Sequence, residues 1–352
     1  TRTGVCGSLR IAGISPAAAP SPEPASAGLC ASPGSPRRRP HPNRRLETRY
    51  STAVDQWRVP EPSGVLDAVM ADGTVIGVRR HGNPDGPRLL LSHGTGLAAD
   101  LYYPYWSQLT DRFDVCIFDL RSHGWNSPSP SAGYNIPTLV NDSQAIAAAV
   151  SAAWGAKPST GVFHSVSTVI ALTHQHERPD FAGLVLFDPP LELSGDADRH
   201  LDEVCLRQAK RARRRRSHFD SRHELAELLA QAPAYSLMPP RTLALLSETT
   251  LRPAAGGGFE LRCPAEQEAQ LYEWYFGFAI QANYNLEGID IPLKAIGADP
   301  TVRYSFLPGL DLETITKFDY DFLPHKTHFL QLEAPEECAE LTVQFLEQHG
   351  LA

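Results

Sequence analysis

The sequence predicts an α/β protein with a doubly wound, mostly parallel sheet of eight strands. Two observations support this prediction. Short apolar runs are separated by longer segments with helical periodicity, the pattern of parallel strands joined by crossover helices. Several of these runs also end in polar, glycine-containing loops. Because ligands of open parallel sheets bind at the carboxyl ends of the strands, such loops are expected to converge on one site.

The expected strands are, in chain order, residues 65–70, 75–80, 89–92, 115–119, 160–163, 184–187, 293–296 and 315–320. Helices fill the intervals. The segment 139–154 is rich in alanine and periodic, and the segment 166–175 directly follows a strand. A helix over 335–348 closes the chain and begins with a proline, which suits a first helical turn because its missing amide has no partner to lose there.

An N-terminal tail, residues 1–50, precedes these elements and is rich in Ala, Pro, Ser and Arg. We expect it to be disordered, because this composition offers little apolar surface to bury. Its eight arginines and its two acids, Glu23 and Glu47, give it a charge of +6, so with −8 overall the rest carries about −14. An acidic body does not predict nucleic-acid binding.

The tail is rich in arginine and poor in acids, as organellar transit peptides are, but it lacks a clear amphipathic helix. An upstream extension without a structural role is the alternative. No apolar run approaches the length of about 20 residues that spans a membrane. The six cysteines are scattered without paired spacing, which predicts no metal site and favours a reducing, cytoplasmic location. They are Cys6, Cys30, Cys116, Cys205, Cys263 and Cys338.

Ser165 is the candidate nucleophile. It lies in the segment 161–172, where an apolar strand stops at a polar turn and a helix of small residues begins. A hydroxyl at such a turn projects from the sheet beside the amides of the helix N-terminus, which can hold a developing oxyanion. A serine here can also be only a helix cap. Two upstream strands, at 88–92 and 115–119, end in glycine-containing loops that are expected to meet this turn.

Several motifs in the same order resemble the α/β-hydrolase superfamily, from about Val65 to the C-terminus. Residues 93–96 (HGTG) resemble its HG oxyanion loop, and residues 119–124 (DLRSHG) its D-x-R-x-H-G segment. Residues 164–167 (HSVS) occupy the place of its nucleophile elbow. Residues 291–300 resemble the strand and turn that carry its acid, and residues 327–337 its histidine loop.

The resemblance implies a catalytic triad of Ser165, Asp299 and His328, in the chain order typical of this fold. It also implies that the backbone amides of Thr95 and Val166 hold the oxyanion. No cofactor and no metal are implied. Around this site we expect four residues to contact the substrate, namely His93, Gly94, Trp274 and Phe278.

Alternatives exist for two triad members. Asp188 follows the strand at 184–187, where some relatives place the acid, although Asp-Pro-Pro is also a plain strand exit. Asp299 precedes a proline, which is common in turns. His325 is close to His328, but only His328 directly precedes the Phe-Leu-x-Leu-Glu-x-Pro pattern. The other histidines of the motifs, His93, His123 and His164, are expected to form hydrogen bonds within their loops.

The elbow departs from the family pattern at two positions. Relatives usually have small residues, mostly glycine, two positions before and after the nucleophile, where this chain has Phe163 and Ser167. Ser167 is small enough to fit. Phe163 must find room between strand and helix, so either the elbow is remodelled and active or the fold is a scaffold with little activity.

The resemblance also implies a helical cap after the sixth strand, which we assign to residues 191–288, between core parts 51–190 and 289–352. Within it, the basic run 210–216 is expected to be a solvated helix face. An aromatic cluster is expected to divide between packing on the body and lining the acyl pocket. Its members are Tyr272, Trp274, Tyr275, Phe276 and Phe278.

The function implied is that of a cofactor-free serine hydrolase of the carboxylic ester hydrolase type. It would cleave an ester, lactone or thioester of a small or medium, mainly apolar substrate through an acyl-enzyme. Hydrolysis of a carbon–carbon bond with the same triad is one alternative. A slow or non-catalytic ligand-binding member of the fold is another. A small-molecule substrate is the only partner predicted, and the oligomeric state is left open.

Overall fold

The computed structural model describes residues 56–129, 134–191, 198–284, 286, 288–302 and 316–352. Side chains are described throughout these ranges except at 198–204 and 276–284. The predicted tail, residues 1–50, therefore lies outside the described residues, as does residue 315, at which the eighth strand was predicted to begin.

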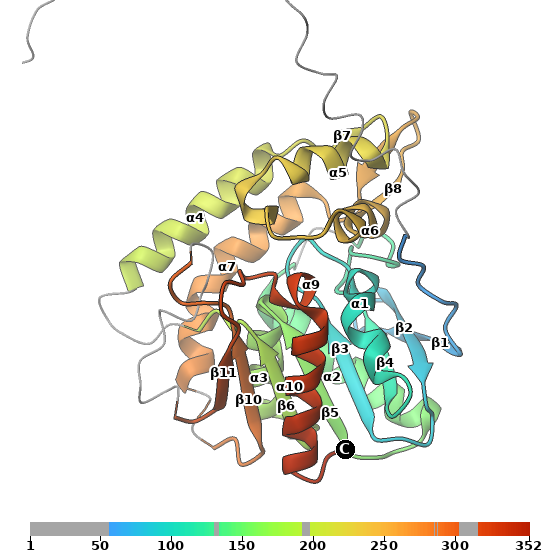
Figure 1. The fold of residues 1–352 in the computed structure, drawn as a ribbon, viewed down its shortest axis with the longest axis vertical. Coiled ribbons are helices and arrows are strands. Elements are labelled where there is room, and N and C mark those ends of the chain that lie inside the picture. Colours follow the sequence, from blue (N-terminus) through green and yellow to red (C-terminus); the bar gives the residue numbers. More distant parts are fainter. Residues whose placement is uncertain (1–55, 130–133, 192–197, 285, 287, 303–315) are drawn as a thin grey trace, which may run out of the picture. The chain divides into compact units, whose positions relative to one another are not determined.

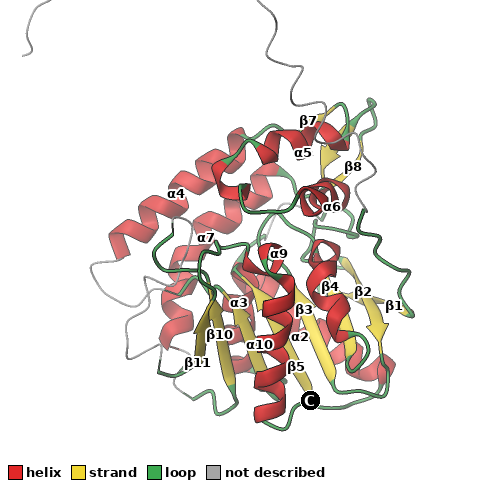
Figure 2. Cartoon of the chain, viewed as in Figure 1, coloured by secondary structure: helices red, strands yellow, loops and turns green. Residues whose placement is uncertain are grey.

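An eight-stranded sheet forms the centre of the fold, in the order β1-β2-β4-β3-β5-β6-β10-β11 (Figures 1 and 2). Its strands are β1 (Gly64–Val69), β2 (Val75–Gly82), β3 (Arg88–Ser92), β4 (Asp114–Phe118), β5 (Ser159–His164), β6 (Gly183–Phe187), β10 (Leu293–Gly297) and β11 (Asp319–Phe322). Only the β1–β2 and β2–β4 pairs are antiparallel. The predicted doubly wound, mostly parallel sheet is confirmed.

Helices cover both faces of this sheet. They are η2 (Ala99–Tyr102), α1 (Tyr103–Trp106), η3 (Ser107–Leu109), α2 (Ile136–Trp154), α3 (Val166–Glu177), α9 (Leu330–Glu333) and α10 (Pro335–Gln348). The start of α2 is fixed by Asn135, whose side chain accepts a hydrogen bond from the amide of Thr138. Helix α2 ends at Trp154 and is followed by Gly155, whose φ of 84° is open mainly to glycine.

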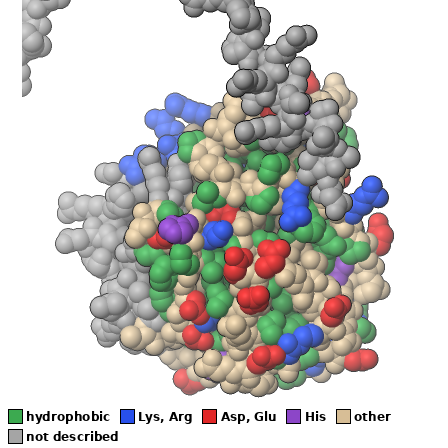
Figure 3. All heavy atoms as spheres, in the orientation of Figure 1, with side chains coloured by type: hydrophobic (Ala, Val, Ile, Leu, Met, Phe, Trp, Pro, Cys, Tyr) green, Lys and Arg blue, Asp and Glu red, His purple; other side chains and the backbone are tan. Residues whose placement is uncertain are grey.

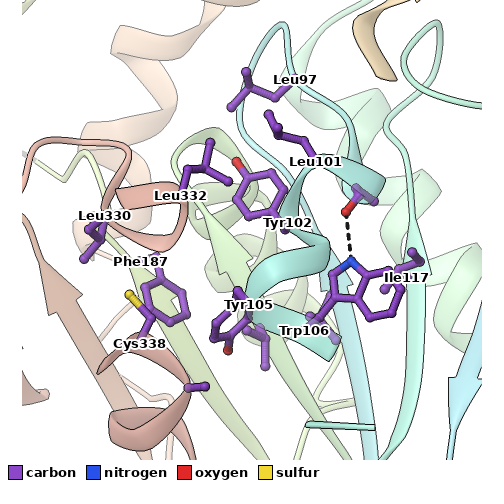
Figure 4. Packing of buried hydrophobic residues seen from close by; sticks show 14 of the residues in the cluster. Leu97, Leu101, Tyr102, Tyr105, Trp106, Ile117, Phe187, Leu330, Leu332 and Cys338 are labelled. Carbon is purple, nitrogen blue, oxygen red and sulfur yellow. Dashed lines mark hydrogen bonds between the residues drawn. The ribbon is translucent and has the colours of Figure 1, made fainter. Parts of the chain in front are cut away.

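Successive side chains along a strand point to opposite faces of the sheet, so the core consists of two layers, one on each face. In β3, Leu90 packs with Phe118 and Phe163 on the face covered by α2 and α3. Its neighbours Leu89 and Leu91 point to the other face, where α1 and α10 lie. Figure 4 shows this second layer, in which the indole Nε1 of Trp106 donates to the carbonyl of Ala99 at 3.1 Å. These central strands are buried on both faces, as expected for a parallel sheet.

The segment between β6 and β10 forms the predicted helical cap. Its elements are α4 (Asp198–Arg214), β7 (His218–Phe219), α5 (Arg222–Ala230), η4 (Pro233–Tyr235), α6 (Pro240–Thr250), β8 (Leu251–Pro253), β9 (Phe259–Leu261) and α7 (Ala265–Tyr284). The three short strands form an antiparallel sheet in the order β7-β9-β8, which the sequence did not predict. Helix α6 contacts η2, and α7 contacts α2 and α3, so the segment packs on helices that follow the central strands β3, β4 and β5.

Most side chains of the basic run 210–216 are exposed, as predicted, and some of them pair with acidic residues of the same segment. Arg213 forms ion pairs with Glu266 and Glu273 of α7 at 2.8 and 2.5 Å. The guanidinium of Arg216 pairs with Glu224 and lies 4.9 Å from the centre of the Phe219 ring. Acidic and basic side chains are interspersed on the face that Figure 3 shows. In the described ranges, no helix is long and apolar enough to cross a membrane.

Phe163 fits into β5 because the neighbouring position on the same face is glycine. The Phe163 ring is 2 % exposed and packs edge-on against Phe118 and Phe181. A Cβ added at Gly161 would lie 2.4 Å from Cε2 of Phe163 and 2.6 Å from Cδ2 of Leu184. The ring therefore turns back along the strand over Gly161, away from the turn at Ser165.

We therefore predict that Gly161→Ala lowers the free energy of unfolding by about 1–3 kcal/mol, because the added methyl overpacks the core. In a Phe163→Ala background the same change is expected to cost at least about 1 kcal/mol less, since the clashing ring is gone. Urea denaturation of the two single variants and the double variant measures this coupling. Gly256→Ala is the control, because a Cβ at Gly256 would meet nothing within 4 Å. Equal costs in both backgrounds would contradict this packing.

Candidate active site

Ser165 lies in a sharp turn between β5 and α3. Its backbone has φ 56° and ψ −127°, a region that L-residues seldom adopt. Its amide donates to the carbonyl of Phe187 at 3.1 Å, and its own carbonyl accepts from the amide of Thr168 at 2.9 Å. These bonds to a neighbouring strand and to the first turn of α3 hold the strained conformation and project the hydroxyl beyond the sheet.

His328 binds Ser165 on one side and a buried carboxylate on the other. Its Nε2 lies 2.9 Å from Oγ of Ser165, and its Nδ1 lies 2.6 Å from Oδ2 of Asp188. Because an ionised carboxylate only accepts hydrogen bonds, Nδ1 carries the proton. Nε2 is then free to accept the hydroxyl proton of Ser165. The structure thus brings together Ser165 and His328, as predicted, and adds Asp188 to them.

The prediction that Asp299 is the acid beside His328 is wrong in this structure, and the alternative, Asp188, occupies the position. Asp188 is fully buried, directly after β6. Its Oδ1 accepts from the amide of Ala298 at 3.1 Å, which leaves Oδ2 facing His328. Its φ of 41° lies in the left-handed region, which Asp and Asn tolerate better than most residues.

Strand order explains why Asp188 reaches His328. β6 lies between β5 and β10, with His164 opposite Phe187 and Phe187 opposite Ile296. The residue after β6 is therefore one strand from Ser165, whereas Asp299 follows the next strand along the sheet. The sequence alone does not give this strand order.

Asp299 instead ties its own turn to the histidine loop. One oxygen accepts from the amide and hydroxyl of Thr301 at 2.8 and 2.7 Å, and the other accepts from the amide of His325 at 2.8 Å. The bond from His325, followed by those from Thr301, lowers the pKa of Asp299 to about 2. The alternative base His325 has a side chain that is 93 % exposed, away from Ser165.

Two backbone amides near Ser165 have no hydrogen-bond partner among the described residues. Val166 is the first residue of α3, so its amide has no partner inside the helix. The amide of Thr95 makes no hydrogen bond with another described residue. Gly94 lies against the elbow, since a Cβ there would be 2.8 Å from Nδ1 of His164 and 3.0 Å from Cβ of Ser165. A glycine at this position lets the loop approach the nucleophile closely.

His93 and His123 hold the loop that follows β3 through hydrogen bonds to its backbone. Nε2 of His93 accepts from the amide of Leu120, and Nδ1 donates to the carbonyl of Gly94. Nε2 of His123 likewise accepts from the amide of Gly96. His93 is fully buried, so its predicted contact with substrate is corrected to a role in holding the loop. Both histidines bond within the loops, as predicted.

A buried carboxylate anchors the same loops to the sheet. Asp119 accepts from the amide of Ala99 at 2.7 Å, from the amide of Trp125 at 3.1 Å and from the guanidinium of Arg79 at 2.7 Å. Although burial opposes its ionisation, Arg79 and these amides lower the pKa of Asp119 below its ordinary value. The D-x-R-x-H-G segment therefore fixes the loop after β3 to the loop after β4.

The cap contributes an ion pair and an aromatic ring near these loops. The guanidinium of Arg215 lies 2.6 Å from the carboxylate of Glu268, and a Cβ at Gly96 would lie 3.3 Å from Glu268 and 3.5 Å from Arg215. The ring of Tyr235 stacks on Phe329, the residue after His328, with centroids 5.0 Å apart. No local sequence motif marks Arg215, Glu268 or Tyr235 as neighbours of these loops.

The predicted aromatic cluster is only partly described. Tyr275 is buried and its hydroxyl donates to the carbonyl of Pro190 at 2.6 Å, so it packs on the body. Trp274 is 46 % exposed. The side chains of Phe276 and Phe278 lie outside the described residues. Among the described residues, no group of three or more His, Cys, Asp or Glu side chains is arranged to hold a metal ion.

We predict that the protein loses stability as the pH falls below about 6.5, the ordinary pKa of histidine, because several histidines are buried in the neutral form. Burial lowers the pKa of His123 to about 3, and burial followed by the charge of Arg79 lowers that of His81 to about 4. The unfolded chain therefore binds more protons in this window. Each such group reduces the free energy of unfolding by up to about 1.4 kcal/mol per pH unit until its folded pKa is reached.

Urea denaturation between pH 7 and 4 measures this slope. His81→Gln is expected to flatten the slope, whatever it does to stability at pH 7. His176→Gln, at an exposed position, is the control and is expected to leave the slope unchanged. A slope unaffected by His81→Gln would contradict the lowered pKa, because it would show that His81 binds its proton equally well in the folded and unfolded protein.

Known proteins share this fold. The chain is similar to E-2-(acetamidomethylene)succinate hydrolase, with 18 % identity, a TM-score of 0.66, and coverage of 81 % of this chain and 99 % of that one. It is also similar to a thioesterase domain from the curacin biosynthetic pathway, with 19 % identity, a TM-score of 0.62, and coverage of 80 % and 99 %. It is similar as well to the enol-lactonase from Burkholderia xenovorans LB400, with 19 % identity, a TM-score of 0.61, and coverage of 81 % of this chain and 100 % of that one. Identities this low show the fold alone.

The family model described as the alpha/beta hydrolase family matches residues 89–341, which is most of the chain. This range contains the turn at Ser165, the loop of Gly94 and Thr95, and His328. The chain belongs to the alpha/beta hydrolase family.

Proposed function

We propose that the chain is a serine hydrolase that cleaves an ester, lactone or thioester of a small or medium, mainly apolar substrate through an acyl-enzyme. The observation that carries the proposal is the continuous hydrogen-bonded series from Ser165 Oγ through His328 to Asp188, with distances of 2.9 and 2.6 Å. Its support includes the two amides beside the hydroxyl, those of Thr95 and Val166. The similar thioesterase domain and enol-lactonase belong to these same bond classes.

The first half-reaction follows from this geometry. His328 Nε2 takes the proton from Ser165 as Oγ bonds to the carbonyl carbon, and the carbonyl electron pair moves to oxygen. The amides of Thr95 and Val166 stabilise that oxyanion, each donor contributing about 3–4 kcal/mol to the transition state. Collapse of the intermediate breaks the bond to the leaving alcohol or thiol, which receives the proton from His328.

The second half-reaction repeats these steps with water. His328 removes a proton from water, the hydroxide bonds to the acyl carbon, and the bond to Ser165 breaks as Oγ regains its proton. Asp188 keeps the Nδ1–H tautomer and stabilises the imidazolium in both halves. The stacked rings of Tyr235 and Phe329 give the base an apolar wall, which suits an apolar acyl group.

The triad assignment is tested with a fluorophosphonate probe and p-nitrophenyl esters of increasing chain length. Ser165→Ala and His328→Ala are expected to abolish labelling and esterase activity. Asp188→Asn is expected to lower kcat by about 10⁴, because the amide favours the wrong imidazole tautomer. The matched control, Asp299→Asn, is expected to cost less than about tenfold, because the partners of its oxygens among the described residues are Thr301 and the His325 amide. Equal losses at Asp188 and Asp299 would contradict the assignment.

The oxyanion loop is tested with Gly94→Ala. The new methyl would lie 2.8 Å from His164 and 3.0 Å from Cβ of Ser165, so the loop must move away from the nucleophile. We expect kcat of the folded variant to fall by about 10², as for loss of one oxyanion donor. Gly256→Ala is the control for the substitution itself. Full activity of Gly94→Ala would place the oxyanion elsewhere.

A further inference from the structure

His164, the residue before Ser165, bridges two loops that meet at the site. Its ring is 1 % exposed, and both ring nitrogens have partners. Nδ1 lies 2.7 Å from the hydroxyl of Tyr102, and Nε2 lies 2.8 Å from the backbone carbonyl of His328. The Tyr102 hydroxyl in turn accepts from the amide of Gly94 at 3.3 Å.

Only one arrangement of protons satisfies these contacts. A carbonyl oxygen only accepts, so Nε2 of His164 carries a proton. The amide of Gly94 only donates, so the Tyr102 oxygen accepts there and its own proton points to Nδ1 of His164. Burial lowers the pKa of His164 and raises that of Tyr102, so both stay neutral. The bonds therefore run in one direction, from Gly94 through Tyr102 and His164 to His328.

The two ends of this series are parts of the proposed catalytic machinery. Gly94 directly precedes Thr95, whose amide is one of the two proposed oxyanion donors. At the other end, the carbonyl belongs to His328, whose Nε2 must stay 2.9 Å from Ser165 Oγ. The rings of His164 and His328 are also 4.6 Å apart and inclined by 38°. Since His164 is also joined through the peptide bond to Ser165, it connects Ser165, the loop of Gly94 and the backbone of His328.

We propose that His164 and Tyr102 are positioning residues, which hold the backbone of His328 and the oxyanion loop at fixed places relative to Ser165. This inference rests on the proposed serine hydrolase function. Neither side chain touches the reacting atoms. Their effect is on the geometry from which His328 takes the proton.

Two substitutions at residue 164 separate the contacts. In His164→Asn the amide lies near the position of Nδ1, so it can meet Tyr102 but cannot reach the carbonyl of His328. In His164→Gln the amide extends to the position of Nε2, so it can donate to that carbonyl. Tyr102→Phe removes the link between His164 and Gly94. The matched controls are His174→Asn and Tyr105→Phe.

These controls are buried groups of the same type away from the site. His174 bonds to Ser143 at 2.9 Å and to Asp180 at 3.0 Å, and the Tyr105 hydroxyl bonds to Thr342 at 2.9 Å. They reproduce the loss of a buried hydrogen bond without touching the loops at Ser165. Any effect of general destabilisation is therefore shared by test and control variants.

The measurement is the rate of Ser165 labelling by the fluorophosphonate probe, resolved into kinact and KI, with the active fraction from the labelling endpoint. We expect His164→Asn to lower kinact about tenfold and Tyr102→Phe to lower it by a similar factor, with KI unchanged, as one positioning hydrogen bond is lost in each. His164→Gln keeps the bond to the His328 carbonyl and leaves the Gly94–Tyr102 bond intact, which Tyr102→Phe removes. It should therefore stay within about threefold of the wild type, and both controls within about twofold. Equal kinact for His164→Asn and His174→Asn, or no advantage of Gln over Asn, would overturn the inference.

Hydrogen–deuterium exchange of the peptide covering residues 325–329 gives a readout independent of catalysis. We expect faster exchange in His164→Asn than in His174→Asn, because the histidine loop loses its bond to His164. Unchanged exchange in His164→Asn would overturn the positioning role even if the wild type labels well. Absence of labelling in a folded wild type would instead overturn the proposed function.

Discussion

The parallel pairing of β5 with β6 is the constraint on which the site depends. It places the turn at Ser165 next to the end of β6, and the amide of Ser165 donates to the carbonyl of Phe187, the last residue of β6. The same register puts Asp188 one strand from the nucleophile. His328 then fits between the two, with a hydrogen bond to each. A strained backbone at Ser165 persists because neighbours on both sides fix it.

Much of the fold follows from short-range patterns in the chain. The apolar runs at the sheet centre are buried on both faces, so their lengths and boundaries could be predicted closely. Ser165 and His328 could be predicted because each lies in a local motif. The pairing of His328 with Asp188 could not, because it depends on strand order, which is a long-range property. Asp299 and Asp188 each follow a strand, and only the order β5-β6-β10 distinguishes them.

Phe163 illustrates a second limit of local patterns. A bulky residue two positions before the nucleophile suggests a crowded elbow when only that position is considered. In the structure, Gly161 supplies the space, because residues two apart share a face of the strand. The small residue in this chain is Gly161, two positions before Phe163 in β5, and the Phe163 ring packs in the core. The departure from the family pattern therefore does not disturb the turn itself.

Hydrogen-bond partners determine which ring nitrogen carries the proton in the buried histidines around the site. His93, His123 and His164 are buried neutral imidazoles whose partners include backbone carbonyls and amides. Of the four described histidines around the site, His328 is the one that binds a buried carboxylate on one side and the hydroxyl of Ser165 on the other. Among these four histidines, it alone is placed to take a proton from Ser165 and carry the resulting charge.

The most direct test of the account is a crystal structure of the protein after reaction with the fluorophosphonate probe. The account predicts a covalent bond from phosphorus to Oγ of Ser165, with the phosphoryl oxygen about 2.7–3.1 Å from the amides of Thr95 and Val166. It also predicts that His328 keeps its bond to Asp188. An adduct at another residue, or a phosphoryl oxygen directed away from both amides, would contradict it.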